Sequence, residues 1–199
     1  MGARITCAVA TSGARRAVPV GKLAWGRKIR TSLLPVLVLD PAQVRLGRAL
    51  AARVSEVTRL TLASAVAGGL IELTSPRFVK QIRDVHTLTS RAIARFLVTG
   101  QGTTEIERNF ISRVGALAAR YGVSLAIISR SYGTWRDTNL RILNEEACRL
   151  GVGPAASNIA RSIIKSSADS GLRRMTRAYA YQLQTVGRSE HSMEAAIQR

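Results

Sequence analysis

The chain has 199 residues, of which 30 are basic and 12 acidic, so its formal net charge is +18. Apolar residues make up 46% of the chain, which is enough for a buried core and excludes an intrinsically disordered protein. No apolar run reaches the roughly 18 residues that cross a bilayer, so an integral membrane protein is excluded. Cys7 and Cys148 are too few for a zinc quartet or a disulfide framework, and we expect a cytoplasmic protein.

The basic residues are spread over the whole chain, and no compact basic patch emerges from their positions. The charge therefore leaves a nucleic-acid partner open without pointing to one. Residues 1–35 contain seven basic residues and no acidic one. We expect a flexible basic arm at 1–39, a helical domain at 40–187 and a polar tail at 188–199.

Helical periodicity begins at residue 40. Apolar residues recur with a period near 3.6 from Val44 to Leu62, from Phe78 to Leu97, from Ile106 to Leu117, from Leu125 to Leu150 and from Ile159 to Val186. Start signals precede the first four of these runs, namely Asp40-Pro41, Ser75-Pro76, Thr104 with Glu107, and Ser124. Because no alternating strand pattern of useful length occurs, we predict an all-α fold of about five helices.

The last predicted helix carries a regular apolar series. Leu172, Met175, Tyr179, Leu183 and Val186 are spaced close to a heptad seam. This spacing predicts that the final helix packs against a second copy of the chain.

Signals for enzymatic chemistry are poor. No phosphate-binding loop, dinucleotide-binding glycine triplet or nucleophile elbow is present. Glu145 and Glu146 are adjacent on a predicted helix, so their side chains should point about 100° apart and not converge. His86 is a candidate cofactor ligand, for example for haem, and the alternative is an ordinary helix residue satisfied by its neighbours. We expect no enzyme, no metal site and no resident cofactor.

Residues 114–133 resemble a helix-turn-helix, with Ala118 at the helix crossing, Gly122 in the turn, and Val123 and Ile128 burying the second helix. Ser124, Ser129 and Arg130 would then contact DNA. Ser131 departs from this pattern, which usually has an apolar residue there, and the apolar series continues past the expected end of a recognition helix. A DNA-binding transcriptional regulator is the alternative function.

A longer resemblance covers residues 96–183. The segment LAARYGVSLAIISRSYGTWRDTNLRILNEEACRLG (117–151) and the segment SADSGLRRMTRAYAYQLQ (167–184) resemble the N-terminal sensory domains of RsbR-type stressosome proteins and PucR-type regulators. Such domains precede diguanylate cyclase (GGDEF) or histidine kinase modules. The resemblance implies a globin-like helical fold, commonly without haem, and a dimer.

By this resemblance the chain is a non-enzymatic sensory or protein-interaction domain in bacterial signal transduction, with a second copy or a signalling protein as partner. Tyr132 and Trp135 would lie in the core or the dimer seam, and Arg136 and Asp137 would contact a neighbouring helix. The plainer alternative is that Trp135 is core and the two charged residues are solvated. Only 16 residues follow Leu183, so we expect either a free-standing sensory subunit or one without its output module.

Overall fold

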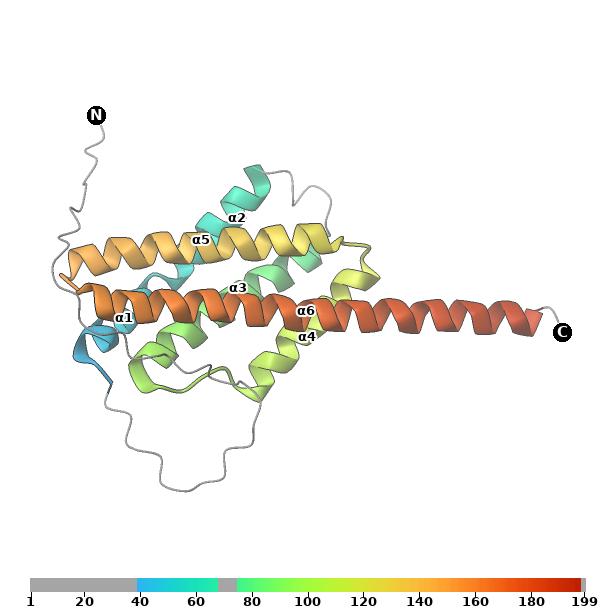
Figure 1. Cartoon of the computed structure of the whole chain (residues 1–199). Coiled ribbons are helices and arrows are strands. Elements are labelled where there is room, and N and C mark those ends of the chain that lie inside the picture. The colour runs from blue at the N-terminus through green and yellow to red at the C-terminus, as the bar shows by residue number, and fades with distance from the viewer. Residues whose placement is uncertain (1–38, 68–74, 198–199) are drawn as a thin grey trace, which may run out of the picture. The chain divides into compact units, whose positions relative to one another are not determined.

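The computed structural model divides the chain into two units, residues 1–38 and 39–199. It describes residues 39–67 and 75–197, with side chains as far as Val186. The predicted arm at 1–39 therefore lies outside the described residues, except for its last residue. The described part forms the helices α1 (Pro41–Ala52), α2 (Val54–Ala67), α3 (Pro76–Thr99), α4 (Glu105–Arg120), α5 (Leu125–Arg149) and α6 (Pro154–Ile197), without a strand. The predicted all-α fold is confirmed, and it fits a helical bundle (Figure 1).

The polar start signals of the sequence are the N-caps of the helices. The Ala42 amide donates to the Asp40 carboxylate at 2.9 Å, and Ser75 and Ser124 accept in the same way at the starts of α3 and α5. Thr104 and Glu107 form a reciprocal capping box at the start of α4. Local side-chain chemistry therefore sets where these helices begin.

The first predicted helix is divided in two, which corrects the expectation of one continuous run. The break is at Arg53, whose backbone leaves helical geometry at φ −102° and ψ 8°. The Arg53 guanidinium donates to Glu56 on α2 and to Glu145 and Glu146 on α5. These long-range ion pairs hold the junction against α5, and no pattern within 40–67 encodes them.

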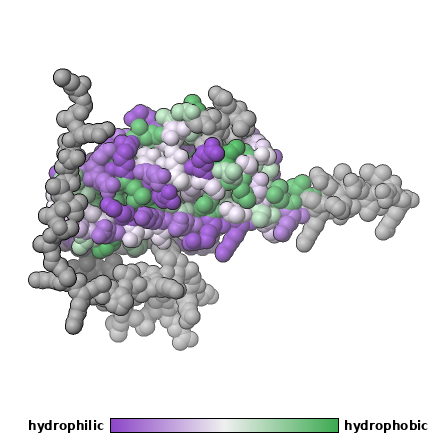
Figure 2. All heavy atoms as spheres, turned by 45° about the horizontal axis from the view of Figure 1, so that its top comes forward, coloured by the Kyte–Doolittle hydropathy of each residue, from purple (hydrophilic) through white to green (hydrophobic). Residues whose placement is uncertain are grey.

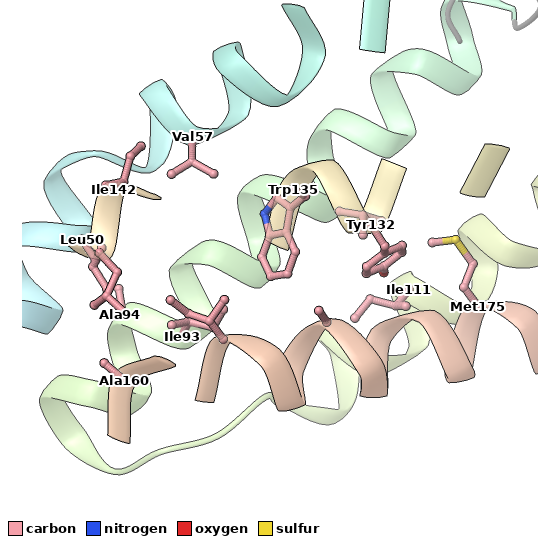
Figure 3. Packing of buried hydrophobic residues seen from close by; sticks show 14 of the residues in the cluster. Leu50, Val57, Ile93, Ala94, Ile111, Tyr132, Trp135, Ile142, Ala160 and Met175 are labelled. Atoms are coloured by element: carbon pink, nitrogen blue, oxygen red, sulfur yellow. The ribbon is translucent and has the colours of Figure 1, made fainter. Parts of the chain in front are cut away.

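The helices pack around an apolar core that every described helix lines. Helix α1 lies against α3, and α2 lies against α3 and α5. Helix α6 runs beside α5 and is crossed by α4 (Figure 1). Figure 3 shows Tyr132 and Trp135 of α5 directed into the space between α3 and α6, with Ile111 and Met175 beside Tyr132. Trp135 is the largest fully buried side chain among the residues that the structure describes.

Two glycines allow α6 to approach its neighbours closely. A Cβ atom on Gly115 of α4 would collide with the backbone of Met175. A Cβ atom on Gly171 of α6 would lie 2.9 Å from Cε1 and 3.0 Å from the hydroxyl oxygen of Tyr132. The distance between α6 and α5 at this point therefore depends on the position of the Tyr132 ring.

The predicted apolar seam of the last helix divides into two parts. Met175 is fully buried, and Leu172 and Tyr179 are half-buried against the core of the same chain. Leu183 and Val186 are exposed by 49% and 41%. The helix backbone continues to Ile197, so most of the predicted polar tail at 188–199 is helical in the structure.

We expect Gly171→Ala to destabilise the chain by about 1–3 kcal/mol, because the added methyl group must displace the Tyr132 ring. Gly133→Ala on α5 is the matched control, since a Cβ atom there meets nothing within 4 Å. Removing that helical glycine should stabilise the chain by about 0.5–1 kcal/mol. Urea unfolding of both variants measures the two shifts, and equal shifts would contradict the close approach of α6 to Tyr132.

Candidate functional site

A buried group of polar and aromatic side chains joins α3 to α5, and we call it the α3–α5 cluster. It consists of His86 and Ser90 on α3 with Ser131, Tyr132 and Trp135 on α5. His86 Nε2 and Ser131 Oγ share a hydrogen bond of 2.9 Å, and the Trp135 indole N–H donates to Ser90 Oγ at 2.9 Å. Both bonds are buried, so each satisfies groups that are cut off from water.

The two hydrogen bonds connect successive turns of α3 and α5, which run in the same direction. His86 and Ser90 are four residues apart on α3, and Ser131 and Trp135 are four residues apart on α5. Residues at this spacing share one helix face, so one turn of α3 faces one turn of α5. The sequence carries this spacing, but it does not show which two helices face each other.

The rings of the cluster pack on one another. The His86 imidazole stacks on the Trp135 indole with centroids 5.7 Å apart and an interplanar angle of 10°. The Tyr132 ring is nearly perpendicular to both rings, at centroid distances of 5.5 Å and 6.2 Å. Such stacked and edge-to-face contacts add to the burial of the rings and fix their orientations.

Burial controls the protonation of the cluster. Desolvation lowers the pKa of His86 to about 3, so the imidazole is neutral at physiological pH. Burial also raises the pKa of the Tyr132 phenol, which keeps it protonated. Nδ1 of His86 and the hydroxyl of Tyr132 are both buried, and neither has a hydrogen-bond partner among the described residues. The cluster is therefore uncharged and incompletely hydrogen-bonded.

His86 was also a candidate cofactor ligand. Its Nε2 is engaged by Ser131, and Trp135 stacks on the ring. A metal or haem iron at Nε2 would therefore have to displace Ser131. Where side chains are described, in residues 39–67 and 75–186, no group of three or more His, Cys, Asp or Glu side chains is placed to hold a metal ion.

The Arg136 guanidinium pairs with the Asp137 carboxylate at 2.9 Å, and their side chains are 41% and 65% exposed. A contact of either residue with a neighbouring helix stays a prediction. They are adjacent on the outer side of α5. Tyr132 and Trp135, which belong to the same sequence motif, are buried in the core.

The predicted helix-turn-helix residues are placed in two environments. Val123 and Ile128 are buried, and Gly122 has the left-handed φ of 65° expected in a tight turn. Ser129 and Arg130 are exposed on the first turns of α5. Helix α5 continues without interruption to Arg149, well beyond the residues that would read DNA.

Glu145 and Glu146 converge on one cation, which corrects the expectation that they diverge. Arg53 Nη1 donates to both carboxylates, at 2.9 Å and 3.0 Å. The Glu146 side chain is only 7% exposed and also pairs with Arg149. Burial opposes its ionisation, but the hydrogen bonds from Arg149 and Arg53 prevail and lower the pKa of Glu146. This group ties the α1–α2 junction to the end of α5.

The described helices were compared with the requirements for crossing a membrane, and the chain was compared with known proteins. In the part of the chain that the structure describes, no helix combines the length and apolar character needed to cross a lipid bilayer. No protein-family model, no curated protein and no solved structure matches the chain.

Acidification should destabilise the chain through His86. Below pH 6.5 the unfolded imidazole takes up a proton, whereas the folded one stays neutral down to a pH of about 3. Between pH 8 and pH 5 the free energy of unfolding should therefore fall by about 2 kcal/mol.

We expect His86→Phe to remove this dependence, because a phenyl ring keeps the stacking without titrating. Glu56, Glu107 and Glu146 have lowered pKa values in the folded state, so their losses begin only near and below pH 4.5. Urea unfolding at several pH values above 5 measures the difference. Identical pH profiles for the two proteins would show that His86 is not buried as a neutral group.

Ser90→Ala should cost about 1–3 kcal/mol, because it leaves the Trp135 indole N–H buried without an acceptor. Ser129→Ala is a control on the exposed side of α5 and should change stability by less than about 0.5 kcal/mol. Chemical denaturation compares the two variants, and equal costs would contradict the rung between Ser90 and Trp135.

Proposed function

We propose that the chain is a non-enzymatic sensory or protein-interaction domain of bacterial signal transduction, acting in the cytoplasm, with α6 as the element that meets its partner. This agrees with the resemblance of residues 96–183 to RsbR-type and PucR-type sensory domains. One observation carries the proposal. Helix α6 packs its first part on α4 and α5 and then exposes the apolar side chains Leu183 and Val186 on one face.

Exposed apolar residues on a helix that has left the core favour a partner surface. An isolated helix in water is marginal, because most helical stability in proteins comes from packing an apolar face. The end of α6 keeps such a face without a covering element among the described residues. A second copy of the chain or a separate signalling protein would supply the missing contacts.

The α3–α5 cluster is placed to influence α6. Tyr132 belongs to the cluster, and its ring lies directly against Gly171 of α6. A rearrangement of His86 or Trp135 that moves Tyr132 would therefore shift the packing of α6. Helix shifts of this kind are a known way for a packed core to pass a change to a distant surface.

One observation favours the alternative, a DNA-binding regulator. Ser129 and Arg130 are exposed directly after the tight turn at Gly122, where a helix-turn-helix would present its recognition residues. Against this, α5 buries Ser131, Tyr132 and Trp135 immediately afterwards. The polar Ser131 departs from a helix-turn-helix pattern because it bonds to His86.

Amide hydrogen exchange across residues 114–150 of the full chain, with and without duplex DNA, tests the two functions. Measurement near 150 mM salt limits the general attraction of a basic chain to any polyanion. We expect strong protection from Ser131 to Leu143 that DNA leaves unchanged.

Protection that rises at residues 124–130 with DNA, but not with heparin, would overturn the sensory proposal. Arg130→Ala is the matched variant for that outcome, because it should abolish the DNA-dependent rise without altering the core. Under the sensory proposal Arg130→Ala leaves the exchange pattern of α5 as it is.

A further inference from the structure

We propose that the outer face of α6 and the adjoining part of α4 bind single-stranded nucleic acid. We call this region the α4–α6 surface, and it consists of Arg113 on α4 with Arg173, Arg174, Arg177 and Tyr181 on α6. The inference goes beyond the proposed function and does not rest on it, because the apolar face that the proposed function uses lies elsewhere on α6. None of these residues belongs to the predicted helix-turn-helix at 114–133.

One stripe of α6 combines exposed cations with an exposed aromatic ring. Arg173, Arg177 and Tyr181 follow one another at intervals of four residues, so successive side chains are offset by only about 40° around the helix axis. The two arginines are exposed, and Tyr181 is 71% exposed. The stripe lies at least about 120° from the fully buried Met175. Figure 2 shows hydrophilic side chains along α6 where it lies on the bundle.

Close contact between the two helices brings a cation of α4 to the same level. A Cβ atom on Gly115 would collide with the carbonyl group of Met175, so the backbones of α4 and α6 touch at this point. Arg113 is exposed two residues before Gly115, and the three arginines of the surface on α6 lie within two residues of Met175. Four cations from two helices therefore gather around one crossing point.

No carboxylate neutralises these cations. Residues 108–136 and 170–187 contain neither Asp nor Glu. Among the described residues, none of the four arginines forms an ion pair, and Asp169, one turn before Arg173, is not paired with it. The basic residues are spread evenly along the sequence, but the crossing of α4 and α6 concentrates some of them. Such a group of unpaired arginines attracts a polyanion, and guanidinium groups match phosphate geometry.

Tyr181 favours single-stranded nucleic acid over other polyanions. A single strand offers phosphates to the arginines and unpaired bases that stack on an exposed aromatic ring. An acidic peptide would use the arginines and leave Tyr181 without a role. In a duplex the bases are stacked on one another and are not available to a side chain on the surface of a helix.

Fluorescence anisotropy of a labelled oligouridylate with the full chain at about 150 mM KCl tests the surface. Arg173→Gln combined with Arg177→Gln should weaken binding about tenfold, because each phosphate contact of a single strand contributes about fourfold at this salt concentration. The slope of log K against log salt should become shallower by about 1.4. An oligothymidylate probe distinguishes RNA from DNA as the strand preferred.

Arg45→Gln combined with Arg48→Gln is the matched control. It removes the same charge from two exposed arginines of α1 that form no ion pair among the described residues. This variant should weaken binding by less than about twofold. An equal loss in the two double variants would show that net charge, and not the α4–α6 surface, holds the strand.

Two substitutions at Tyr181 test base stacking. Tyr181→Ser should weaken oligouridylate binding at least about fivefold, whereas Tyr181→Phe should retain it because the ring is kept. Heparin, which carries charge but no bases, should bind both variants as it binds the wild-type chain. Circular dichroism establishes that all variants keep their helix content.

The inference would be overturned if Tyr181→Ser bound oligouridylate as the wild-type chain does, or if duplex RNA competed as well as the single strand. Binding of an oligoglutamate peptide that depends on Arg173 and Arg177, without binding of oligouridylate, would assign the surface to an acidic protein instead. Each of these results leaves the exchange experiment on α5 unaffected, so the proposed function is judged separately.

Discussion

Contact between α3 and α5 depends on large side chains rather than on close backbone packing, and Tyr132 extends this contact to α6. His86 and Ser90 reach across from α3, and Ser131 and Trp135 reach back from α5. Each polar group in these two rungs is buried, so breaking one rung leaves an unsatisfied group in the core. This cost specifies which turn of α3 faces which turn of α5, a choice that apolar contacts alone would leave loose.

Tyr132 extends the same constraint to α6. Its ring packs against both His86 of α3 and Gly171 of α6. Met175, one turn further along α6, lies against Gly115 of α4. Helices α3, α5 and α6 therefore contact one another around Tyr132, and α4 contacts α6 one turn further along. Interiors packed this closely transmit displacements instead of absorbing them. A bundle built in this way suits a role in which a change in the core alters the outer part of α6.

Ion pairs between residues that are far apart in the sequence support the fold. Arg53 gathers Glu56, Glu145 and Glu146 at the α1–α2 junction, and Arg95 pairs with Glu107 beside the start of α4. Most other cations have no such carboxylate to pair with, because the chain has far fewer acidic than basic residues.

The sequence by itself determined the fold class and most helix starts. Asp40, Ser75, Thr104 and Ser124 act on amides two or three residues away, so these caps could be recognised without knowing the fold. The burial of Trp135 also followed from its helical spacing. These features depend on local chemistry or on one helix face, and both can be read along the chain.

Only the tertiary structure decided the break at Arg53, the pairing of His86 with Ser131, and the division of the α6 seam. Each depends on a partner far away in the sequence, such as Glu145 for Arg53 or α4 for Met175. Ser131 was visible only as a polar residue in an apolar position. Its reason lies 45 residues away in His86, because a buried hydroxyl is tolerated only where the fold supplies a hydrogen-bond partner.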